Sequence, residues 1–114
     1  MSQRVVVMNG QRLFQTEHGG QWRTDRVDKA GNLKPGLYRL DAALPADQSR
    51  IHPGVIVHAD RQFVYQQAGS MLRRHAAAAF DVLPRAGTAT QIAYAGGRAY
   101  CQPFAEPVRR GLKM

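Results

Sequence analysis

Short β-prone runs that end at glycine-containing turns are the feature that most constrains the fold of this chain. The pair Asn9-Gly10 separates residues 4–8 from residues 11–16, and the pair Gly96-Gly97 follows residues 88–94. Such pairs favour tight hairpins, because asparagine and glycine adopt the positive φ angles that these turns require. The pattern predicts a mainly β fold built from antiparallel hairpins.

The middle of the chain predicts another hairpin, in which residues 55–59 and 63–67 flank a turn near Asp60-Arg61. Both segments have the usual length of a strand. Residues 21–27 form a further candidate strand. Within it, Trp22 is the large side chain expected in the core of the N-terminal half.

Residues 71–83 fit two descriptions. A strand over 71–75 followed by a short helix over 76–83 is favoured, because four alanines precede the helix stop at Pro84. A continuous helix over 70–83 is the alternative, since its apolar residues share one helical face. Many short strands with one short helix predict a strongly bent small barrel or packed hairpins, SH3-like or OB-like, with a small α+β fold as a variant.

The chain of 114 residues is long enough for one domain with one core. We expect a single domain over residues 1–105, with an N-terminal hairpin region (1–41), a connector (42–53) and a C-terminal β region (54–105). The connector contains Pro45 and Pro53, which interrupt regular structure. We expect residues 106–114 to form a basic tail.

The composition favours an anionic partner. The net charge is +8, and thirteen of the sixteen cationic residues are arginine, which suits contacts with phosphate or carboxylate groups. The single cysteine, Cys101, excludes an internal disulfide framework, fits a reducing cytoplasm and is expected to act as a small hydrophobic residue. No apolar run approaches the length of about 20 residues that crosses a bilayer, so no membrane insertion is expected.

The sequence contains no recognisable catalytic pattern. His58, Asp60, His75 and Asp81 have side chains that can bind metal ions, but their spacing does not complete a set of ligands. Neither a phosphate-binding glycine loop nor a serine nucleophile motif is present. We therefore expect a binding protein without catalytic activity, metal or cofactor.

Polar residues within the strand-like segments 63–67 and 71–75 predict a binding face. A soluble edge strand is the plainer explanation of the same pattern. If neighbouring strands align, Tyr65, Gln67, Arg73 and His75 share one side of the sheet, whereas a slip by one residue brings Gln66 and Arg74 there. The candidate binding residues are Tyr65, Gln66, Gln67, Arg73, Arg74 and His75.

The order and spacing of several short elements resemble the KfrB family of bacterial plasmids. The elements are GGQW, KAGNLKPGLY, GVIVHAD, VYQQ followed by Gly69, RRH and IAYAGGRA. The resemblance implies a small accessory module of plasmid maintenance or conjugation, with plasmid-encoded maintenance or transfer proteins as partners. Protein–protein interaction is the first expectation, and sequence-independent nucleic-acid binding through phosphate contacts is the second.

Overall fold

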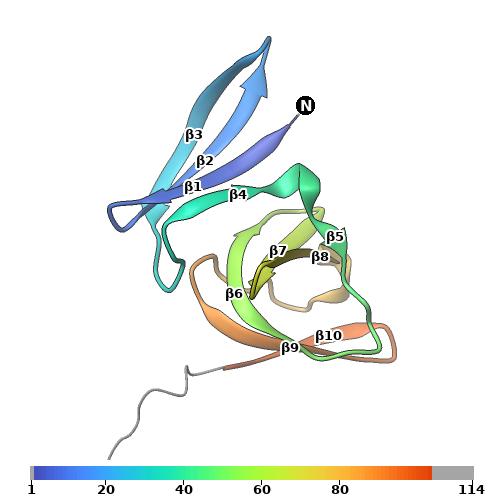
Figure 1. The fold of residues 1–114 in the computed structure, drawn as a ribbon. Coiled ribbons are helices and arrows are strands. Elements are labelled where there is room, and N and C mark those ends of the chain that lie inside the picture. The colour runs from blue at the N-terminus through green and yellow to red at the C-terminus, as the bar shows by residue number, and fades with distance from the viewer. Residues whose placement is uncertain (1, 104–114) are drawn as a thin grey trace, which may run out of the picture.

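The computed structural model describes residues 2–103 and contains two β-sheets. The first sheet has the strand order β3-β2-β1-β4, and all its neighbouring strands are antiparallel. Figure 1 shows that β2 and β3 project away from the rest of the molecule. The strands of this sheet are β1 (Gln3–Met8), β2 (Gln11–His18), β3 (Gln21–Lys29) and β4 (Gly36–Arg39).

The second sheet has the order β10-β9-β6-β7-β8-β5 and curls into an incomplete barrel (Figure 1). A bridge between Phe80 and Ala99 joins the segment after β8 to β10 and so draws the two sides of the barrel together. Two short 3-10 helices, η1 (Leu40–Ala42) and η2 (Ala77–Ala79), complete the fold. The strands are β5 (Leu44–Pro45), β6 (His52–Ala59), β7 (Phe63–Ala68), β8 (Met71–Ala76), β9 (Ala89–Ala95) and β10 (Arg98–Pro103).

The predicted mainly β fold is confirmed, and so are its hairpins. Asn9 and Gly10 have φ angles of 53° and 74° and connect β1 to β2, as the turn chemistry requires. Residues 71–76 form a strand followed by one 3-10 turn, so the alternative of a continuous helix is wrong. The specific SH3-like or OB-like form stays a prediction.

Apolar side chains form two separate clusters. The inter-sheet core lies between the sheets and includes Val5, Val7, Leu40, Val57 and Tyr65. The barrel core lies inside the curled sheet and includes Ile56, Val64, Phe80 and Ile92. Strands β6 and β7 therefore bury side chains on both of their faces.

An irregularity in β6 lets that strand serve both cores. Ile56 pairs with Gln66 and His58 pairs with Tyr65, so Val57 is an extra residue in the ladder. A bulge of this kind rotates the strand locally and changes which side chains face each side. As a result the three consecutive residues Ile56, Val57 and His58 are all buried.

Trp22, the large side chain expected in the core of the N-terminal half, lies on a strand at the end of the first sheet. Trp22 is half-buried in β3, and its ring is covered by the Arg4 guanidinium, whose carbon lies 4.0 Å from the ring centroid. Cys101 is exposed in β10. β3 and β10 are the terminal strands in the strand orders of the two sheets, which leaves their side chains less covered than those of central strands.

The predicted connector, residues 42–53, is more structured than its prolines suggested. It contains β5, which pairs with β8 in parallel, and it ends in the first two residues of β6. The predicted basic tail, residues 106–114, lies outside the described residues.

Candidate interaction site

The pairing of β7 with β8 divides the predicted binding residues between two faces. Gln66 lies opposite Arg73 and Tyr65 lies opposite Arg74. Residues directly opposite each other share a face, so Gln66, Arg73 and His75 lie on one side and Tyr65 and Arg74 lie on the other. The expected grouping of Tyr65 and Gln67 with Arg73 and His75 is therefore wrong by one residue in register.

On the inner face, Gln66 and His75 form a buried polar network. The Gln66 amide nitrogen donates to the His52 carbonyl at 2.8 Å and to the Thr90 carbonyl at 3.1 Å. The Gln66 side-chain oxygen consequently faces His75 Nε2 at 3.0 Å and accepts a hydrogen bond from its N–H group. Nδ1 of His75 is then the acceptor for the Tyr94 hydroxyl, at 2.5 Å.

Burial keeps this network neutral. It lowers the pKa of His75 to about 4, helped by the nearby His52, and raises the pKa of Tyr94 to about 12. Gln66 and His75 are also fully enclosed by protein. These two residues thus form hydrogen bonds with polar groups inside the barrel, where a partner cannot reach them.

On the outer face, Tyr65 belongs to the inter-sheet core, and the same burial raises the pKa of its hydroxyl. Arg74 reaches the residue between η1 and β5, where its Nη1 donates to the Ala43 carbonyl at 2.6 Å, and its guanidinium carbon lies 5.5 Å from the Phe63 ring centroid. These contacts hold the outer face of β8 against its neighbours.

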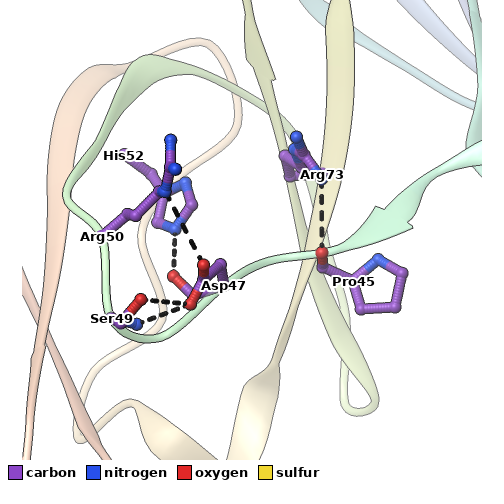
Figure 2. Close-up of polar contacts among 6 residues, drawn as sticks. All are labelled: Pro45, Asp47, Ser49, Arg50, His52 and Arg73. Atoms are coloured by element: carbon purple, nitrogen blue, oxygen red, sulfur yellow. Dashed lines mark hydrogen bonds and ion pairs between the residues drawn. The ribbon is translucent and has the colours of Figure 1, made fainter.

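The loop between β5 and β6 is anchored by Asp47 (Figure 2). One carboxylate oxygen accepts hydrogen bonds from the Ser49 hydroxyl at 2.6 Å and from the Ser49 amide at 2.9 Å, which lowers the pKa of Asp47. The Asp47 carbonyl accepts from His52 Nε2 at 2.7 Å, and Arg73 makes a long 3.5 Å contact to the Pro45 carbonyl. Together they fix β5 at the edge of the second sheet.

A groove of about 570 Å³ lies between β4, η1, β5 and the start of β8, and we call it the β4–β8 groove. Three of its apolar side chains are unusually exposed: Leu37 at 55%, Leu44 at 47% and Met71 at 40%. A second pocket of about 380 Å³ adjoins it, and Tyr38 and Gln67 line both. The groove residues are Pro35, Gly36, Leu37, Tyr38, Arg39, Ala42, Leu44, Gln67, Ser70, Met71 and Leu72.

Of the predicted binding residues, Gln67 is the one that lines this groove. Its amide nitrogen donates to the Gly69 carbonyl at 2.8 Å, a local bond near the surface. Leu37, Leu44 and Met71 were not predicted, because apolar residues in short strands look the same in sequence whether they are buried or exposed.

The residues considered as metal ligands do not gather at one place. No group of three or more His, Cys, Asp or Glu side chains is arranged to hold a metal ion within residues 2–103. His58 Nε2 lies 3.5 Å from an Asp60 carboxylate oxygen, while burial lowers the pKa of His58 to about 4. In the same range, no helix is long and apolar enough to span a bilayer.

Comparison with known proteins yields two matches. The family model described as KfrB Domain matches residues 51–103, which cover β6 to β10 and leave out the first sheet. Protein TraB of Escherichia coli is 31% identical over 101 residues, and the alignment covers 85% of this chain and 68% of TraB. This second likeness extends beyond the barrel into the first sheet.

Proposed function

Because this chain belongs to the KfrB domain family, we propose that it is an accessory binding module that acts through protein–protein interaction in plasmid maintenance or conjugative transfer. The family match and the likeness to TraB support a plasmid-related function. The partners we propose are plasmid-encoded maintenance or transfer proteins. The proposal assigns no catalytic step and no cofactor to the chain.

The β4–β8 groove is the observation that carries the interaction role. Leu37, Leu44 and Met71 expose apolar surface around one hollow, and such grouping on a protein surface commonly marks an interface. The groove is bordered by β4, the last strand of its sheet within the described range, and edge strands accept extended peptides.

The chemistry of the groove indicates its occupant. Arg39 lines it and lies 3.2 Å from an Asp41 carboxylate oxygen at the surface, in a chain with a net charge of +8. We therefore propose that the groove receives an extended segment of a partner protein, with apolar side chains for the hollow and a carboxylate for Arg39.

The experiment compares groove variants with a matched control. Leu37→Ser and Met71→Ser each remove exposed apolar surface from the groove, whereas Val82→Ser does so elsewhere, at a side chain that is 82% exposed. Tagged proteins are used to capture partners from plasmid-bearing cells, with and without nuclease. The expected result is loss of capture by the groove variants and nuclease-resistant capture by the wild type and Val82→Ser.

Equal capture by all four proteins would refute the role of the groove.

Loss of capture after nuclease treatment would instead favour the second candidate function, sequence-independent binding of nucleic acid. The net charge of +8 supports that candidate. It predicts an affinity that falls with salt, with a logarithmic slope of about −0.9 for each duplex phosphate contacted. Titration with unrelated duplexes at several salt concentrations measures the slope.

A further inference from the structure

A third pocket, of about 640 Å³, lies on a different part of the surface and shares no residue with the β4–β8 groove. It forms between the first sheet, β6 and the segment that leads into β9. Within residues 2–103 its lining contains four cationic side chains against one carboxylate, that of Asp28. We call it the basic pocket, and its defining residues are Arg12, Arg26, Lys29, His58 and Arg85.

Arg12 is the central residue of the basic pocket and is only 6% exposed. Its Nη2 lies 3.7 Å from an Asp28 carboxylate oxygen, which Arg26 also approaches, at 3.4 Å. Its Nε and Nη1 atoms are buried and have no hydrogen-bond partner among the described residues. A buried guanidinium with so little compensation is unfavourable for folding, so the stability of the fold does not account for it.

His58 forms an adjacent part of the pocket lining. Its ring stacks on Phe14, with centroids 4.3 Å apart and an interplanar angle of 4°, and its Nδ1 atom is buried without a partner in the described range. Burial lowers the pKa of His58 to about 4, Asp60 opposes this shift, and Arg12 and Arg26 add to it. Within residues 2–103, the unpaired hydrogen-bond donors on the interior side of the pocket are therefore those of the Arg12 guanidinium.

The backbone around the pocket is held in place by a close contact between the loop after β3 and the loop before β9. The Asn32 amide donates to the Gly87 carbonyl at 2.8 Å. A Cβ atom on Gly31 would lie 2.6 Å from that same carbonyl oxygen, and both glycines have positive φ angles, of 60° and 89°. This contact positions the loop after β3 against the segment of Arg85 before any ligand arrives, which favours binding.

We propose that the basic pocket binds a phosphate group, with Arg12 as the buried donor and Arg26, Lys29 and Arg85 as the surrounding positive charges. Several cations facing one carboxylate suit an anion that carries more than one charge, and a planar guanidinium matches the oxygen spacing of phosphate. The phosphate can belong to a small phosphorylated molecule or to the end of a nucleic acid. This inference is independent of the proposed groove function.

Inorganic phosphate is the first probe. Thermal unfolding is followed with increasing phosphate at constant ionic strength for the wild type, Arg12→Met and Arg50→Met. Arg50 is an exposed arginine outside the pocket, so its variant controls for loss of charge. Phosphate is expected to raise the unfolding temperature of the wild type and Arg50→Met, and Arg12→Met is expected to bind about 10-fold to 100-fold more weakly.

Two further measurements keep the proposal open to refutation if Arg12→Met does not fold. Arg85→Met changes an exposed pocket residue and is expected to weaken phosphate binding several-fold. In the wild type, phosphate is expected to shift the NMR signals of the His58 ring and leave those of His52, which lies outside the pocket. Unchanged His58 signals, or an equal thermal response of all variants, would overturn the proposal.

The source of the phosphate is tested by competition. A 5′-phosphorylated oligonucleotide and the same oligonucleotide without the phosphate are added to the wild type saturated with inorganic phosphate. Displacement by the phosphorylated form alone assigns the pocket to a nucleic-acid end. If neither form displaces phosphate, the pocket is assigned to a small phosphorylated molecule. Equal displacement by both forms would contradict a pocket built for a single phosphate group.

Discussion

Replacing Gln66 by methionine measures what the polar network inside the barrel contributes to stability. Methionine has a similar shape and volume, so the change leaves little cavity and mainly removes polar atoms. It deprives the His52 and Thr90 carbonyls of a donor and His75 Nε2 of its acceptor. Gln66 itself is fully buried, so water does not replace these bonds.

Each buried polar group that loses its partner costs about 1–3 kcal/mol. For three partners, with some relaxation of the surroundings, Gln66→Met is expected to lower the free energy of unfolding by about 3–6 kcal/mol. That is a large share of the total for a domain of this size, which is typically about 5–15 kcal/mol. Urea unfolding followed by circular dichroism measures the loss as a midpoint lower by about 2 M at unchanged slope.

Gln67→Met is the matched control, since it makes the same chemical change at the next residue. Gln67 makes one local hydrogen bond, to the Gly69 carbonyl, and lies near the surface. Its replacement is expected to cost less than about 1 kcal/mol. Equal losses for the two variants, or a loss below about 1 kcal/mol for Gln66→Met, would refute the reasoning from the buried network.

The remaining predictions concern acid stability and backbone packing. Burial lowers the pKa of His58 and His75 to about 4, so between about pH 6.5 and pH 4 the unfolded chain binds more protons than the folded one. Stability should therefore fall as the pH drops through this window, by up to about 3 kcal/mol for each histidine, and a flat urea midpoint between pH 7.5 and pH 4 would contradict it. Gly54→Ala should lower the free energy of unfolding by more than about 3 kcal/mol, because the new methyl group overlaps the Gln67 carbonyl oxygen on the paired strand. Gly20→Ala should lower the free energy of unfolding by only about 1–2 kcal/mol, since its Cβ meets nothing within 4 Å and only its φ of 81° is unfavourable. Comparable shifts in unfolding temperature for the two variants would argue against the close approach at Gly54.

The parts of the fold that were predicted correctly depend on local chemistry. The Asn9-Gly10 turn specifies its hairpin through the backbone angles of two adjacent residues, and no distant contact is needed. The alanines of residues 76–79 likewise end β8 within a few positions, although they form a 3-10 turn and not a longer helix.

The parts that were missed depend on contacts between distant residues. Nothing local distinguishes Gln66 from Gln67. The two carbonyls to which Gln66 donates belong to residues 14 and 24 positions away in the chain. Trp22 was expected in the core because of its size, whereas it is half-buried because it lies on an edge strand. The basic pocket was not predicted for the same reason, since Arg12 and Arg85 line one pocket only after the chain has folded.

The two-sided burial of β6 and β7 has a consequence for how the protein opens. If the first sheet separated from the barrel, Val57 and Tyr65 would be exposed to water together. Partial opening at this seam is therefore unfavourable, and the two sheets should lose their structure in one cooperative transition. Hydrogen exchange would show this as equal protection of amides in β1 and β7, and the smallest segment able to fold alone would be larger than the stretch 51–103 that the family model matches.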